Sequence, residues 1–183
     1  MKKILILICI ILFCNSGILS QDNKKTDKLV MEILQRLDST KRSAIGKDFC
    51  EFKSVTLNGE VISEKDLIGK ITFIDLWFAT CSPCIAEMGN LIELYNKLKD
   101  DEDFQFLSFT VDAFEIANKA VEKYNIPFIV CPVSHEEAYR MNFNTGFPTK
   151  IIIDKEGKIV FFQNSGSKDQ GVKEIEDIIK QLL

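Results

Sequence analysis

The feature that most constrains the fold of this chain is an apolar run that is followed closely by a pair of cysteines. Residues 71–78 are rich in β-branched and aromatic side chains, which is typical of a buried strand. Cys81 and Cys84 follow almost at once. Apolar residues then recur at helical spacing, at Ile85, Met88, Ile92, Tyr95 and Leu98. The pattern therefore predicts a strand, a short reversal and a helix, with Cys81 at the helix N-terminus.

The rest of the chain alternates predicted strands and helices. The expected strands are Phe104–Val111, Ile126–Cys131, Thr149–Asp154 and Lys158–Phe162. The expected helices are a leader within residues 22–45, then residues 113–124 with Asp112 as cap, 136–141 and 170–183. Asn58-Gly59 predicts an early hairpin, and Lys155-Glu156-Gly157 predicts a second one. This alternation predicts an α/β fold with a central mixed sheet and helices on its faces.

The first twenty residues have the pattern of a secretory signal. Lys2 and Lys3 precede an apolar run of ten residues, Ile4 to Phe13, and small polar residues follow. Ten residues at about 1.5 Å each do not span a hydrocarbon core of roughly 30 Å, which disfavours a permanent membrane helix. We expect export and cleavage before Gln21, and a lipid anchor on Cys14 is the alternative. The expected organisation is a signal at 1–20, a helical leader at 21–45 and one domain at 46–183.

The charge and cysteine content exclude several functions. Of 23 Lys and Arg, two lie in the signal, which leaves 21 against 27 Asp and Glu. With no basic patch, neither nucleic acid nor an anionic membrane is an expected partner. There is no glycine-rich phosphate loop, so we expect no nucleotide and no cofactor. Four cysteines remain beyond the signal, namely Cys50, Cys81, Cys84 and Cys131.

Two cysteines separated by two residues can exchange disulfides or bind metal. Zinc needs about four ligands, and the chain has no second paired motif, so the pattern favours redox chemistry and no metal. At a helix N-terminus, unpaired backbone N–H groups and the helix dipole stabilise a thiolate, which lowers the pKa of Cys81 from its free value of about 8.5. Cys81 is therefore the candidate nucleophile, and Cys84, one turn later, is the candidate resolving thiol.

The segment from Ile74 to Cys84 resembles the active-site stretch of the thioredoxin superfamily. Gly146-Phe147-Pro148-Thr149, 62 residues beyond Cys84, is similar to the cis-proline loop of that family. The signal, the early hairpin and Glu87-Met88 resemble the exported TlpA/ResA-like branch. The resemblance covers about residues 46–183 and implies a thioredoxin-like fold with an N-terminal hairpin extension.

The resemblance also implies roles for individual residues. Asp75, six residues before Cys81, would relay a proton for Cys84, although a salt-bridged or edge-exposed carboxylate is the alternative. Phe147-Pro148 would form a cis peptide bond that lets residue 147 pair with a bound peptide. Trp77 would pack beside the cysteines at the substrate-binding face. Two positions depart from the family pattern. Thr80 stands where a tryptophan is common, and Gly89 stands where a helix-kinking proline is usual.

The expected function is disulfide exchange with protein partners in the periplasm or cell envelope. Asp75 and the resemblance favour a reductase. We also expect an electron donor in the envelope and a monomeric protein. A peroxiredoxin-type peroxidase is an alternative, but its Pro-x-x-x-Thr-x-x-Cys motif does not occur around Cys81. A Sco-type copper carrier is another, and it would need His135, the single histidine, close to Cys81. Whether Cys50 and Cys131 pair stays open at this point.

Overall fold

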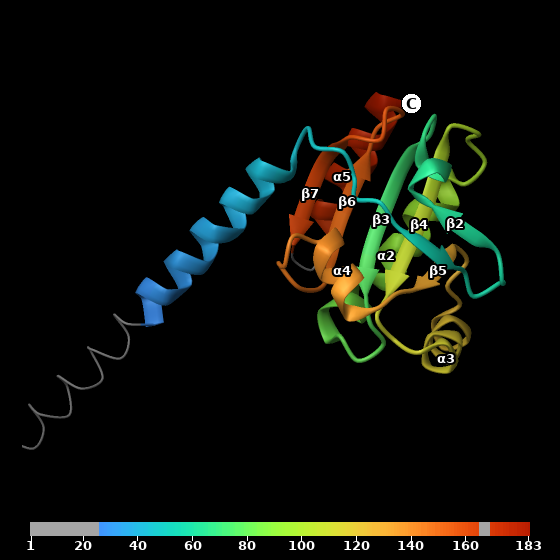
Figure 1. The fold of residues 1–183 in the computed structure, drawn as a ribbon, viewed down its shortest axis with the longest axis horizontal. Coiled ribbons are helices and arrows are strands. Elements are labelled where there is room, and N and C mark those ends of the chain that lie inside the picture. The colour runs from blue at the N-terminus through green and yellow to red at the C-terminus, as the bar shows by residue number, and fades with distance from the viewer. Residues whose placement is uncertain (1–25, 165–168) are drawn as a thin grey trace, which may run out of the picture. The chain divides into compact units, whose positions relative to one another are not determined.

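A computed structural model describes residues 26–164 and 169–183 (Figure 1). The predicted signal, with Cys14, lies outside these residues. The chain divides into two compact units, Met1–Ser39 and Thr40–Leu183. Within the predicted leader, residues 26–44 are helical. None of the helices in the described residues is both long and apolar enough to cross a bilayer.

The second unit is built on a five-stranded sheet with the order β5-β4-β3-β6-β7. These strands are β3 (Ile71–Trp77), β4 (Phe104–Thr110), β5 (Ile129–Pro132), β6 (Thr149–Ile153) and β7 (Ile159–Asn164). β3, β4 and β5 run parallel, whereas β6 is antiparallel to both β3 and β7. The predicted mixed sheet is therefore confirmed, with β3 in the middle and every one of its residues buried.

Helices cover both faces of this sheet. They are α2 (Ser82–Leu98), α3 (Phe114–Tyr124), α4 (His135–Met141) and α5 (Asp169–Leu182). In Figure 1, α2 and α5 lie behind the sheet and α4 lies in front of it. Two hydrophobic cores result, one beneath α2 and α5 and one beneath α4. The predicted α/β class with thioredoxin-like layers is confirmed.

Alternation along β3 sends its side chains to the two cores in turn. Phe73 and Trp77 belong to the core that contains Cys81 and Cys84, whereas Ile74 belongs to the opposite core. Since successive side chains of a strand point to opposite faces, Asp75 projects toward the cysteine side. This parity places a carboxyl group under α2.

The predicted early hairpin is present. β1 (Lys53–Val55) and β2 (Val61–Ser63) pair antiparallel across the Asn58-Gly59 turn and form a separate two-stranded sheet. Gly59 has a φ of 86°, the left-handed conformation that this turn requires and that glycine adopts without strain. The 3₁₀ helix η1 (Glu64–Leu67) then leads to β3.

One local prediction was wrong. Asp112 does not cap the third helix, because the N-cap of α3 is Ala113 and it makes no side-chain cap bond. The apolar face expected for α2 packs against the core, although its residues are buried to different degrees. Ile85, Ile92 and Tyr95 are only partly buried. The fully buried residues are Cys84, Glu87, Met88, Leu91, Leu94 and Leu98.

Candidate active site

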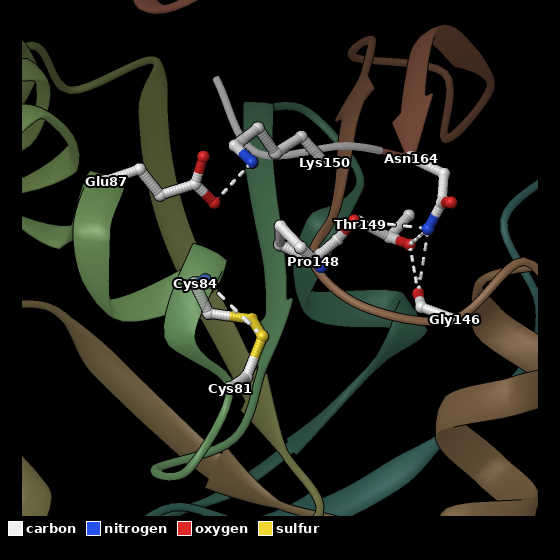
Figure 2. A network of polar contacts seen from close by, with 8 residues as sticks. All are labelled: Cys81, Cys84, Glu87, Gly146, Pro148, Thr149, Lys150 and Asn164. Atoms are coloured by element: carbon white, nitrogen blue, oxygen red, sulfur yellow. Dashed lines mark hydrogen bonds and ion pairs between the residues drawn. A yellow bond between two sulfur atoms is a disulfide. The ribbon is translucent and has the colours of Figure 1, made fainter. Parts of the chain in front are cut away.

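The cysteine pair lies at the N-terminus of α2 as a disulfide (Figure 2). Cys81 is the N-cap residue, and its Sγ accepts a hydrogen bond of 3.3 Å from the backbone N–H of Cys84. Pro83 lies in the first turn, where its missing N–H has no intrahelical partner to lose. Both residues are buried, with an exposed fraction of 4% for Cys81 and 1% for Cys84. A reduced Cys81 at this position would have its thiolate stabilised by the helix terminus.

Asp112 fastens the loop that leads to the cysteines. Its Oδ2 accepts a 2.6 Å hydrogen bond from the Ala79 N–H and a 2.9 Å bond from the Thr110 hydroxyl. The carboxylate thus ties the end of β4 to the reversal between β3 and α2. Thr80, which follows Ala79, is exposed beside Cys81.

Trp77 lies in the core that holds both cysteines and has no exposed surface. Its indole N–H donates a 2.6 Å hydrogen bond to Ser108 Oγ on β4. A buried indole needs such an acceptor, which explains a serine at a fully buried position of β4. This placement fits packing beside the cysteines better than direct contact with a substrate.

The loop before β6 is held by hydrogen bonds that converge on one carbonyl (Figure 2). The Gly146 carbonyl accepts from Asn142 Nδ2 at 2.8 Å, from Thr149 Oγ1 at 2.6 Å and from Asn164 Nδ2 at 3.0 Å. Asn164 also donates to the Pro148 carbonyl at 3.2 Å. The Phe147–Pro148 peptide bond in this loop is cis.

Phe147 joins this loop to the loop that precedes the cysteines. Its ring packs edge-on against Phe78, with centroids 5.4 Å apart, and against Tyr139 of α4, with centroids 5.8 Å apart. Phe78 and Phe147 are half-buried and Tyr139 is exposed, so the three rings reach from the core to the surface. Two loops far apart in sequence are thereby held as one surface.

Three charged groups are buried behind the disulfide. Lys150 Nζ donates to Glu87 Oε1 at 2.5 Å, and the exposed fractions of these two side chains are 0% and 2% (Figure 2). Asp75 is also buried, and its Oδ1 has no hydrogen-bond partner. Burial raises the pKa of Asp75 to about 7, although Lys150 acts to lower it and Glu87 acts to raise it further. A carboxyl group that titrates near neutral pH can accept and return a proton.

The other candidate residues lie apart from this chemistry. Cys50 and Cys131 are free thiols rather than a second disulfide. Burial raises the pKa of both, that of Cys131 to about 12, so they remain protonated. His135 is exposed at the first position of α4. In the described part of the chain, no three His, Cys, Asp or Glu side chains gather in a way that could hold a metal ion.

Several residues of the site were missed from the sequence. Lys150 is a lysine in an apolar strand, and that mismatch was the available signal for a buried charge. Asn142 and Asn164 gave no comparable signal, because asparagine is common wherever helices and strands end. The sequence predicts Asp112 as the cap of the helix that follows it. Its observed partner, Ala79, lies 33 residues away, and local pattern does not indicate a partner at that distance.

The fold and the disulfide at a helix N-terminus define the class, a thioredoxin-like protein with a redox-type cysteine pair. Residues 44–179 match the family model of Redoxin, and the chain belongs to this family. It is similar to two proteins named thiol-disulfide oxidoreductase ResA. One, from a strain of Bacillus cereus, is 36% identical over 120 residues, which is 63% of this chain and 67% of the relative. The other, from Bacillus thuringiensis subsp. konkukian, is 30% identical over 139 residues, 75% of this chain and 78% of the relative.

A solved structure agrees with these relatives. The thioredoxin domain of a thiol-disulfide oxidoreductase from Bacteroides vulgatus is 28% identical, with a TM-score of 0.64 over 74% of this chain and 98% of that one. The predicted TlpA/ResA-like branch of the thioredoxin superfamily is confirmed, and with it the enzyme class of thiol-disulfide oxidoreductase.

Proposed function

We propose that this protein is a cell-envelope reductase that transfers two electrons from Cys81 and Cys84 to disulfides of protein partners. The observation that carries the proposal is the Cys81–Cys84 disulfide at the N-terminus of α2. Cys81 is the N-cap residue, and its sulfur already accepts a hydrogen bond from the backbone N–H of Cys84. Envelope location rests on the signal-like residues 1–20.

In the first step the Cys81 thiolate attacks one sulfur of the substrate disulfide. A bond forms between Cys81 and that sulfur, the substrate disulfide breaks, and the other substrate sulfur leaves as a thiolate. Phe147 and the cis peptide bond to Pro148 are the groups we assign to peptide binding. Their support is the aromatic contact of Phe147 with Phe78, which places the proline loop against the loop that carries Cys81.

In the second step Cys84 resolves the mixed disulfide. Its thiol proton passes to the Asp75 carboxylate, and the resulting thiolate attacks the sulfur of Cys81. The bond between Cys81 and the substrate breaks, the substrate leaves as its second thiolate, and the Cys81–Cys84 disulfide forms. Asp75 lies under α2 on the cysteine side of β3, and its pKa near 7 suits this exchange. A dithiol donor in the envelope then returns both electrons to the enzyme.

Reduction, rather than oxidation, is the direction we assign. The direction rests on the likeness to the reducing envelope thioredoxins. Asp75 would serve the exchange step in both directions, because it can accept the proton of Cys84 and return it. A measured reduction potential above about −150 mV would reverse this assignment, because oxidants of the class lie in that range.

The decisive experiment is trapping with Cys84→Ser in the exported protein. Without the resolving thiol, mixed disulfides should accumulate on Cys81 and be identified by mass spectrometry after non-reducing separation. The matched control is Cys81→Ser, which should trap no partner. If neither variant accumulates a covalent partner, or if both trap the same ones, exchange through Cys81 is refuted. Asp75→Asn should lengthen the life of the mixed disulfide without abolishing its formation.

A further inference from the structure

Lys150 is a lysine whose side chain has no exposed surface, on β6, two residues after Pro148. Taking an ammonium group out of water is strongly unfavourable unless a close counter-charge compensates it. Glu87 provides that charge at 2.5 Å and is itself buried. Glu87 lies on α2 one turn beyond Cys84, so the ion pair links the strand after the proline loop to the helix of the disulfide.

Asp75 is the third member of this cluster. Asp75 and Lys150 are direct partners in the antiparallel pairing of β3 with β6. Directly paired residues project from the same face of a sheet, so both side chains point toward α2. Ile152, two residues after Lys150, belongs to the same core as the cysteines, which agrees with this parity. A strand, its neighbour and a helix thus each contribute one charged group to one buried site.

The charges of the cluster do not balance. Glu87 and Lys150 neutralise each other, which leaves Asp75 as the group whose ionisation adds an uncompensated charge. On the other side of β3, the partner of Asp75 is the neutral Ser108, whose hydroxyl oxygen accepts from Trp77. Among the described residues, Lys150 and Glu87 are the charged side chains that act on Asp75, in opposite directions. The thiols of reduced Cys81 and Cys84 are further titratable groups at the start of the helix on this side, and Cys84 is the more buried of the two residues.

We propose that Lys150 is a positioning residue for the proton transfer at Asp75, because its ammonium group holds Glu87 in place and stabilises the ionised form of Asp75 that accepts the Cys84 proton. The inference rests on the proposed exchange function. The step is the transfer of one proton from the Cys84 thiol to the Asp75 carboxylate, and Lys150 itself neither gains nor loses a proton. The lysine acts through charge, from the strand that also carries the proline loop.

The test compares Glu87→Gln with the double variant Glu87→Gln/Lys150→Met, each as the oxidised full-length protein. These two proteins differ only in the charge of residue 150, and the Gln background removes a second carboxyl from the titration. The titration of Asp75 is followed by its carboxyl signal in infrared or ¹³C NMR spectra. The midpoint of the Asp75 titration should lie about 1 to 3 pH units lower in Glu87→Gln than in the double variant. In Glu87→Gln the ammonium group of Lys150 acts on Asp75 without a second carboxylate beside it. Lys158→Met, at an exposed lysine paired with Asp48, is the control and should leave the midpoint unchanged.

The kinetic readout is the pH profile of mixed-disulfide resolution, whose midpoint should move with that of Asp75. Equal Asp75 midpoints in the single and double variants would overturn the role of Lys150. Neither compared protein leaves a buried charge unpaired, because Lys150 still faces Asp75 in Glu87→Gln and the double variant removes the whole ion pair, which is often tolerated. Lys150→Met alone would leave Glu87 unpaired and is therefore not used. The titration needs no substrate, so a shifted midpoint together with failed trapping on Cys81 would reject the exchange function and leave the electrostatic cluster standing.

Discussion

Asp75 is a carboxyl group buried in the middle of a strand, and its ionisation opposes folding. Its pKa is raised from 3.8 to about 7 in the folded protein, chiefly by burial. Between these values the unfolded chain binds fewer protons than the folded one, so this residue makes stability fall as pH rises from about 4 to 7. Below that window the residue is neutral in both states and the penalty is absent.

Asp75→Asn should therefore stabilise the oxidised protein at pH 8 and have little effect at pH 4.5. A shift of this size corresponds to a difference on the order of 4 kcal/mol above the window. Urea unfolding of both proteins at the two pH values measures it, and the difference between the proteins cancels the other titrating groups. A stability difference that does not change with pH would show that Asp75 titrates as an ordinary carboxyl group.

The hydrogen bonds of Asp112 should also contribute to the stability of the fold. Its Oδ2 holds the Ala79 N–H just before the cysteines, and a hydrogen bond to a charged acceptor contributes roughly 1.5 to 3 kcal/mol. Asp112→Ala should lower the free energy of unfolding by about that amount, and Asp112→Asn by less, because its amide oxygen still accepts. Urea unfolding gives both values. Equal stability of the alanine variant and the parent would show that Ala79 is held by other contacts.

The residues to which we assign the reaction lie close together in the sequence, whereas the groups around them come from distant parts of the chain. Cys81, Cys84 and Asp75 lie within ten residues and follow a local pattern of strand, reversal and helix. Lys150 meets Glu87 across 63 residues, so the pair depends on the register of β6 against β3. Sequence pattern predicts a strand, but a shift of one residue in register would send Lys150 to the other face.

At the scale of the element, α2 runs without a break through Gly89, where relatives of this fold were expected to have a proline. A Cβ at Gly89 would meet no atom within 4 Å, and its φ is not in the left-handed region. Glycine inside a helix is less favourable than alanine by about 0.5 to 1 kcal/mol. Gly89→Ala should therefore raise the unfolding midpoint in urea.

Gly157 is the matched control for that substitution. It has a φ of 85°, and an added Cβ would lie 2.8 Å from Cδ1 of Ile68. Gly157→Ala should lower stability, since both the backbone and the packing resist the side chain. If Gly89→Ala also destabilised the protein, α2 would need glycine at that position, as a kinked helix would.

Elements with strong local signals were predicted well. The Asn58-Gly59 hairpin, β3 and the final hairpin occur where expected, because turn chemistry and apolar runs act over a few residues. The sequence also predicted the helix α2, but it did not predict which of the apolar residues of α2 are fully buried. Apolar side chains of α2 point in several directions, because one side of the helix packs on the sheet and another contacts α5. Only the tertiary arrangement decides which stripe is fully buried.

At the scale of the whole molecule, the members of both hydrophobic cores among the described residues come from the second unit. Their lowest-numbered member is Ala44, which lies in the second unit, Thr40–Leu183. The segment just after Ala44 is fastened to the last hairpin by backbone hydrogen bonds. Gly46 N–H donates to the Ile159 carbonyl at 2.8 Å, and Phe49 N–H donates to the Gly157 carbonyl at 3.0 Å. The boundary of the folding unit should therefore lie before residue 44.

A chain that begins at Thr40 should keep the cooperative unfolding transition and the reduction potential of the chain that begins at Gln21. A chain that begins at Glu51 should lose about 2 to 5 kcal/mol, because it lacks the buried Ala44 and Phe49 and leaves the Ile159 and Gly157 carbonyls without these donors. Urea unfolding and redox titration against glutathione measure both properties. If the Thr40 chain unfolded as readily as the Glu51 chain, the helix at residues 26–39 would contribute to the stability of the domain, and the two units would not be independent. Equal stability of all three chains would instead show that residues 44–49 do not stabilise the hairpin to which they are hydrogen-bonded.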